Sequence, residues 1–106
     1  MKDNVIAVST GGTHTVAITT DGGLWAWGRN NRGQLGDGTR TDRYSPLKIM
    51  DGVYYVSAGG VRTMALKSDG SLWGWGDNRH GQLGDGTTRD RNRPVNITSN
   101  ILTPSL

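Results

Sequence analysis

The sequence predicts an all-β fold made of β-propeller blades, each a unit of four antiparallel strands, with two blades' worth of chain. Three observations predict it. The 106 residues contain two copies of a unit that recurs with a period of 48 residues. Each copy divides into short β-rich runs between Gly-containing turn signals, and no segment keeps the period of an amphipathic helix. Four-stranded units that recur every 40–50 residues or so are typical of propeller blades.

The repeat is exact over its central loop. Residues 33–39 read Gly-Gln-Leu-Gly-Asp-Gly-Thr and recur unchanged as residues 81–87, and Pro46 recurs as Pro94. We therefore divide the chain into a first blade repeat with its inter-blade loop, residues 1–52, and a second blade repeat, residues 53–106. The second repeat ends in a strand that we expect to complete a neighbouring blade.

Each repeat is expected to contain four strands. Those of the first repeat are predicted over residues 5–10, 14–19, 24–28 and 46–49. Those of the second are predicted over residues 53–58, 62–67, 72–76 and 94–97. Val16 and Ile18 alternate with small or polar residues, which places them on one face of their strand. Asp21-Gly22 separates two strand patterns and is a strong hairpin signal, and Pro46 suits the first residue of a strand.

The composition narrows the class of protein. There are 17 glycines, no cysteine and a net charge of +3 with a sequence pI near 9.7. Without cysteine the fold has no disulfide and no thiolate metal site. No stretch approaches the length of an apolar membrane span, and the first residues do not form a signal peptide, so we expect no membrane partner. The compartment is left open.

The repeated motifs resemble the repeat of the regulator of chromosome condensation family. They are a Gly-Gly-x-x-Thr-x-Ala segment, the Asp-Gly hairpin, Leu-Trp-x-Trp-Gly, a loop with Asn followed by Gly-Gln-Leu-Gly, and a Pro-x-x-Ile strand. The resemblance covers residues 5–97 and implies blades of a propeller that has seven blades in the founding member. That member's exchange activity on the small GTPase Ran needs a full propeller, so we do not carry it over. The Asp-Gly-Thr loop ending resembles bacterial members, and such similar repeats would also suit an engineered fragment.

The order of strands predicts self-association. In the family the Pro-x-x-Ile strand is expected to join the three strands that follow it, which leaves the first blade one strand short and the last strand spare. We therefore expect a cyclic homo-oligomer, a trimer of six blades or a tetramer of eight, closed by head-to-tail contacts. The strand that would pass between subunits consists of Pro94, Val95, Asn96 and Ile97.

Repeated apolar residues are expected to pack the blades against one another. Trp residues beside Gly at strand ends and Leu residues in the long loops suit such an interface, and the adjacent Gln side chains are expected to hydrogen-bond backbone groups that would otherwise be unpaired. The expected packing residues are Trp25, Trp27, Gln34, Leu35, Trp73, Trp75, Gln82 and Leu83. An aromatic binding platform is the alternative interpretation of the Trp residues.

Arginines gather in and near the two long loops. In a ring they would form a positive rim for an acidic protein or a nucleic acid, although interleaved aspartates weaken that field. The residues of this predicted rim are Arg40, Arg43, Arg89, Arg91 and Arg93. A further alternative is an inhibitor or adaptor that caps a partner protein with one face of the propeller.

Nothing in the sequence indicates catalysis. His14 and His80 occupy different positions in the repeat, and no nucleophile motif or phosphate-binding loop is present. The spacing around Asp37 and Asp85 does not fit a calcium loop, and an Asp that bonds local backbone in a turn is the better interpretation. We expect no catalytic residues, no cofactor and no metal, and a scaffold that binds other proteins.

Overall fold

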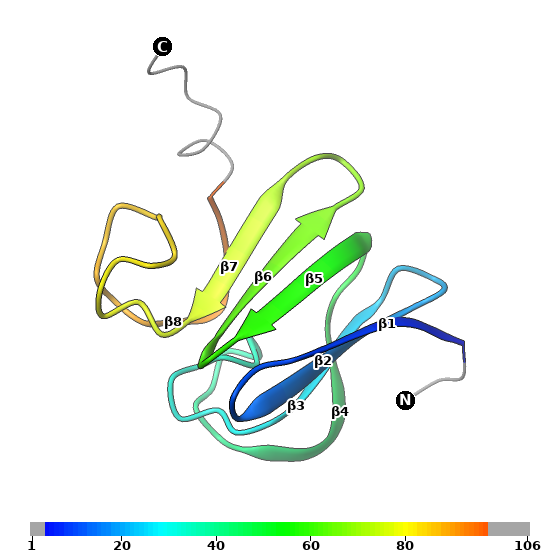
Figure 1. Cartoon of the computed structure of the whole chain (residues 1–106), viewed down its shortest axis with the longest axis horizontal. Coiled ribbons are helices and arrows are strands. Elements are labelled where there is room, and N and C mark those ends of the chain that lie inside the picture. The colour runs from blue at the N-terminus through cyan, green and yellow to red at the C-terminus, as the bar shows by residue number, and fades with distance from the viewer. Residues whose placement is uncertain (1–3, 98–106) are drawn as a thin grey trace.

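A computed structural model describes residues 4–97 and shows two four-stranded antiparallel sheets (Figure 1). This confirms the all-β fold and the two blades. The first sheet consists of β1 (Val5–Thr10), β2 (His14–Thr19), β3 (Leu24–Gly28) and β4 (Arg43–Met50). The second consists of β5 (Val53–Gly59), β6 (Arg62–Lys67), β7 (Leu72–Gly76) and β8 (Arg91–Asn96). Each sheet is a meander in which every strand pairs with the next along the chain.

The two Asp-Gly hairpins form as expected. Gly22 has a φ of +84°, a left-handed conformation that favours glycine. The Asp21 carboxylate accepts hydrogen bonds from the Gly23 amide at 3.1 Å and from the Thr19 hydroxyl at 2.6 Å. Gly70 repeats this turn with a φ of +88°. The turns fix the register in which Val16 lies opposite Ala26 across β2 and β3.

The expected membership of the Pro-x-x-Ile strand is wrong. β4 pairs with β3, so that Lys48 lies opposite Trp25, and it completes the first sheet instead of opening the second. The physical reason is the long loop of residues 29–42, which folds back on itself and returns the chain to the sheet it has just left. β8 pairs in the same way with β7, with Val95 opposite Gly74. The first blade therefore lacks no strand, and residues 94–97 lie against their own blade.

The two sheets face one another across an apolar core. β5 lies beside β1 and β2, whereas β4 and β8 form the outer edges (Figure 1). Pro46 and Pro94 are thus placed on edge strands, where proline is tolerated. The core contains buried side chains from both sheets and from the long loop of the first repeat, namely Val16, Ile18, Leu24, Ala26, Leu35, Val53, Val56, Ala65 and Trp75. Within residues 4–97 no helix is long and apolar enough to cross a membrane.

Candidate functional site

The surface between the two blades is the best-defined site of the chain. Val16 and Ile18 of the first sheet and Leu35 of the long loop that follows β3 are fully buried in it. From the second sheet come Trp75, which is also fully buried, and Trp73, which is half-buried. Trp73 and Trp75 are two residues apart on β7 and lie opposite Ala65 and Thr63 of β6. They therefore share one face of the second sheet, which is the face packed against the first blade.

A buried polar chain crosses the blade interface. The Thr63 hydroxyl donates to the Gln34 carbonyl oxygen at 2.8 Å, and His14 Nε2 lies 2.8 Å from the same hydroxyl oxygen. Since the hydroxyl has a single proton, the imidazole must be the donor in the second bond, which fixes the Nε2–H tautomer. His14 is only 3 % exposed, and burial lowers its pKa to about 4. The imidazole is therefore neutral in the folded chain at neutral pH.

This burial predicts that stability falls in mild acid. The folded-state pKa of His14 lies below its ordinary value of 6.5, so the unfolded chain binds the proton first as the pH falls. The free energy of unfolding should decrease by about 1–3 kcal/mol between pH 7 and pH 4.5, as followed by denaturant midpoints. Protonation of acidic groups such as Asp85, whose pKa is about 2, lowers the free energy of unfolding only below that pH range. His14→Gln should flatten the profile and His80→Gln, at an exposed position, should not; a flat wild-type profile would contradict the assignment.

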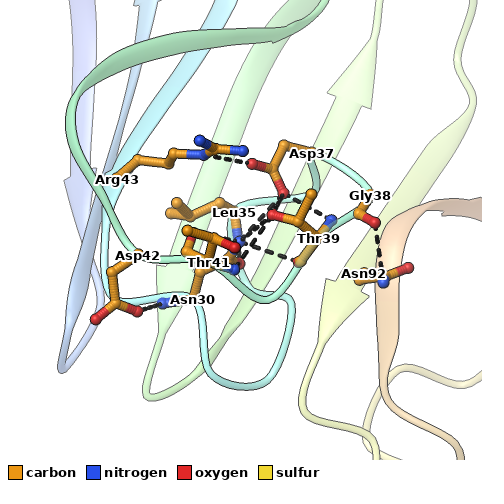
Figure 2. Close-up of polar contacts among 9 residues, drawn as sticks. All are labelled: Asn30, Leu35, Asp37, Gly38, Thr39, Thr41, Asp42, Arg43 and Asn92. Atoms are coloured by element: carbon orange, nitrogen blue, oxygen red, sulfur yellow. Dashed lines mark hydrogen bonds and ion pairs between the residues drawn. The ribbon is translucent and has the colours of Figure 1, made fainter.

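The long loop of each repeat is built around one buried asparagine. Asn30 Nδ2 donates to Asp37 Oδ1 at 3.1 Å and to the carbonyl oxygens of Thr39 and Thr41, each at 3.0 Å (Figure 2). Its Oδ1 accepts from the Leu35 amide at 3.0 Å. The side chain thus satisfies backbone groups along the whole loop and fixes Leu35 where it enters the core.

A carboxylate closes the same loop. Asp37 accepts from the Thr39 amide at 2.9 Å and the Thr39 hydroxyl at 2.7 Å, and its other oxygen lies 2.9 Å from Arg43 Nε (Figure 2). Burial raises the pKa of Asp37, but the hydrogen bonds from Thr39 and Arg43 outweigh it and the pKa lies below its ordinary value. The expected local turn is confirmed, with an arginine as an additional partner.

The second repeat builds the same loop. Asn78 Nδ2 donates to Asp85 Oδ1 at 3.0 Å and to the Thr87 carbonyl at 3.1 Å, and Arg91 Nε lies 2.8 Å from Asp85 Oδ2. The Leu83 amide donates to Asn78 Oδ1 at 3.0 Å. The repeated residues therefore make the same bonds from asparagine to aspartate, from arginine to aspartate and from the leucine amide to asparagine in both loops.

The predicted packing residues are not all placed alike. Leu35 and Trp75 meet in the core between the sheets. Leu83 is also buried, but on the opposite side of the second sheet, where its Cδ2 would lie 3.4 Å from a Cβ added at Gly74. Trp25 and Trp27 are half-buried on the outward face of the first sheet.

The two predicted glutamines brace the starts of their loops. Gln34 is buried and its Oε1 accepts from the Arg32 amide at 2.8 Å. Gln82 is half-buried, and its Oε1 accepts from the His80 amide at 2.9 Å. Both bonds join a side chain to the backbone two residues earlier, so they stabilise the turn that precedes each buried Leu.

The arginines of the predicted rim divide into two groups. Arg43 and Arg91 are half-buried and paired with the loop aspartates. Arg40, Arg89 and Arg93 are exposed. Loop aspartates therefore already neutralise part of the rim, and its remaining field comes from the exposed side chains.

Sequence reasoning missed three features of the site. One is the role of Asn30 and Asn78, although the recurrence of Asn before the Gly-Gln-Leu-Gly segment was a usable signal. Another is the bond between His14 and Thr63, which gave no signal because these residues occupy different positions in the repeat. The third is the Arg32–Asp90 pair, 2.8 Å across the interface.

Comparison with known proteins places the chain in a family. Two family descriptions, both of the regulator of chromosome condensation (RCC1) repeat, match it, one over residues 5–34 and 53–82 and the other over residues 21–66 and 69–102. Protein RCC2 homolog of Danio rerio is 51 % identical over 39 residues, which is 37 % of this chain and 8 % of that protein. The ultraviolet-B receptor UVR8 of Arabidopsis thaliana is 45 % identical over 42 residues, or 40 % of this chain and 10 % of that protein.

Solved structures agree with the fold. Human WBSCR16 superposes with a TM-score of 0.82 at 29 % identity, and Prp20p of Saccharomyces cerevisiae with 0.81 at 22 % identity. They cover 91 % and 92 % of this chain, and this chain covers 26 % of each. The chain thus spans about a quarter of these structures and a tenth or less of the curated relatives named above. These relatives support neither a bacterial origin nor an engineered fragment. The chain belongs to the family of regulator of chromosome condensation (RCC1) repeat proteins.

Proposed function

We propose that this chain is a non-enzymatic interaction module whose blades join head to tail with those of further copies, closing into a homo-oligomeric propeller. A trimer would contain six blades and a tetramer eight. One observation carries the proposal: the two complementary faces that meet inside the chain recur on its two outer sides, where neither of the two described sheets covers them. Because β4 already completes the first sheet, the copies would meet face to face and not by exchange of a strand.

The outer face of the second blade is one half of this contact. Residues at the positions of Val16, Ile18 and Leu35 in the second repeat are Met64, Leu66 and Leu83. Met64 and Leu66 are half-buried, whereas Val16 and Ile18 are fully buried beneath the second blade. The outer face of the second blade therefore keeps the apolar residues of the internal interface although neither described sheet packs against it. Such a face is typical of an interaction surface.

The outer face of the first blade is the other half. Val8, Trp25 and Trp27 occupy the positions that Val56, Trp73 and Trp75 have in the second blade. Val8 is 60 % exposed, although Val56 is only 7 % exposed in the internal interface. A face with two tryptophans and an exposed valine matches the apolar core of stable protein interfaces.

The absolute mass of the 106-residue chain in solution tests the proposal. Light scattering on a size-exclusion column, over a hundredfold range of concentration, should show one species of three or four chains. A monomer throughout the range would contradict the closed ring. A continuous increase in mass would indicate head-to-tail contacts that do not close.

A second candidate function is the binding of another protein or a nucleic acid at the exposed arginines. The Prp20p structure was described with its binding properties to Gsp1p and histones, and yeast RCC1 was solved bound to Kap60. Exposed Arg40, Arg89 and Arg93 favour an acidic partner here as well. Affinity for DNA that falls steeply with salt would support a nucleic-acid binder. Salt-tolerant capture of one protein would support an adaptor or inhibitor that caps its partner with one propeller face.

A further inference from the structure

The polar contacts across the internal interface provide a template for the contact between copies. The Ala58 amide of the second blade donates to Ser9 Oγ of the first at 3.0 Å. The Thr63 hydroxyl of the second blade donates to the Gln34 carbonyl of the first at 2.8 Å. Two copies that meet head to tail in the same way would bring together the repeat counterparts of these groups.

Most of these groups recur at the corresponding outer positions. On the second blade, Ser57 and Gln82 repeat the serine and the glutamine of the internal contact. On the first blade, Thr15 repeats the threonine. Thr15 is half-buried, and its hydroxyl forms no hydrogen bond within residues 4–97. The polar groups needed for the same contact are therefore present on both sides of the chain.

Arg62 is the main exception to this match. It holds the position of His14, the buried imidazole whose Nε2 lies 2.8 Å from the Thr63 hydroxyl oxygen. Arg62 is exposed, and it forms no ion pair with any residue that the structure describes. A neutral, buried side chain in the internal contact thus becomes a cation where the next copy would meet the second blade.

The site of the imidazole does not suit a guanidinium. A Cβ added at Gly11 would lie 2.6 Å from His14 Cε1, so the ring packs directly on the Gly11 backbone. At the counterpart Gly59, an added Cβ would meet no other described atom within 4 Å, so the Arg62 side chain does not take the place of the ring. A guanidinium stays charged in proteins. Its burial without a carboxylate costs far more than burial of a hydrogen-bonded imidazole.

A second exchange of residues is expected to have a smaller effect. The internal pair of Arg32 and Asp90 has as its counterparts His80 of one copy and Asp42 of the next. The Arg32 side chain is 30 % exposed, so the internal pair lies at the solvent edge of the interface. Ion pairs at exposed positions contribute little to stability. Arg62 is therefore the position at which the two contacts differ most in free energy.

We propose that Arg62 determines the strength of self-association by keeping the contact between copies weaker than the contact between blades of one chain. This inference rests on the proposed head-to-tail association. When Thr15 of the next copy approaches, the guanidinium must lose water or bend aside along its aliphatic stem. Either change reduces the free energy gained by the apolar faces, so that copies associate reversibly while the two blades of each chain stay together.

Arg62→His tests this role, because it gives the outer face the imidazole of the internal contact. The concentration at which assembly is half complete should fall by roughly tenfold or more. Arg89→His is the matched control. Arg89 is exposed, and its counterpart Thr41 stays exposed beside the internal interface. The control should change that concentration by less than about twofold.

A double-mutant cycle shows whether the gain comes from this contact. In a Thr15→Val background the imidazole has no hydroxyl to bind, so Arg62→His should change the half-assembly concentration by less than about twofold. In a Thr20→Val background, which removes an exposed hydroxyl of the same blade, the full gain should remain. Light scattering over a dilution series measures assembly, and circular dichroism with urea midpoints checks that every variant is folded.

The outcomes separate the role of Arg62 from the ring. A wild-type trimer or tetramer whose assembly Arg62→His leaves unchanged or weakens would overturn the role of Arg62 and leave the ring standing. A gain that persists in the Thr15→Val background would also overturn it, because the effect would then lie outside this contact. A wild-type monomer with an Arg62→His variant that assembles would support the role of Arg62 and contradict the ring, and monomers in both cases would overturn both proposals.

Discussion

Replacing Trp75 by alanine is expected to lower the free energy of unfolding by about 3–5 kcal/mol. Trp75 is the largest fully buried side chain of the described residues and lies between the two sheets. Its removal leaves a cavity beside Leu35, whose position is fixed by Asn30 and cannot easily shift inward. Since small domains have total stabilities of about 5–15 kcal/mol, this loss is a large share of the total.

Urea unfolding followed by circular dichroism measures this effect without depending on tryptophan fluorescence. Trp27→Ala is the matched control, because Trp27 holds the same position in the first repeat but is only half-buried. Measured at concentrations where copies do not associate, the control should lose at least 1 kcal/mol less than Trp75→Ala, in proportion to the smaller area it buries. Equal losses would show that Trp75 does not join the two blades.

The second large effect is expected at Asn30. Asn30→Ala removes the donor to Asp37, Thr39 and Thr41 and the acceptor for Leu35, all in a side chain with no exposed area. The backbone groups left without partners should lower the free energy of unfolding by about 2–4 kcal/mol. Urea unfolding followed by circular dichroism measures this loss of stability.

Asn31→Ala is the matched control for this loop. Asn31 is exposed, and its side chain accepts one bond of 3.2 Å from Gln34 Nε2. Its replacement should change the free energy of unfolding by less than about 1 kcal/mol. If Asn30→Ala lowered the free energy of unfolding as little as Asn31→Ala, water would have to replace the asparagine side chain in the loop. That result would contradict the rigid support of Leu35 by Asn30.

The sequence predicted the features that depend on neighbours along the chain. Alternation places Val16 and Ile18 on one face, and the Asp21-Gly22 turn fixes β2 against β3, so these strands have the expected bounds. Pairing of β4 depends on where a long loop returns, which local pattern does not specify. A strand around Pro46 is compatible with the sheet before it and with the sheet after it. The prediction assigned it to the sheet after it, whereas it completes the sheet before it.

The sequence predicted which residues pack between the blades but not how they are arranged in space. Leu35 and Trp75 could be recognised as packing residues because apolar side chains beside Gly recur with the period. The sequence could not show that Leu35 and Leu83 lie on opposite sides of one sheet, because that requires knowing which blade covers which face. It also could not show that Arg43 is held by Asp37, since the bond depends on the folded path of the loop.

The boundary between the blades has a consequence for how such chains grow in evolution. Only Asp51 and Gly52 separate β4 from β5, so the 48-residue unit coincides with one complete sheet. Duplication or loss of one unit in the gene therefore adds or removes an entire blade without dividing any sheet between old and new sequence. Because all strand pairs are sequential, each unit can also form its strand pairs early, through local contacts. The number of blades in a lineage is thus free to change in whole steps, with only the fit between first and last blade left for selection to adjust.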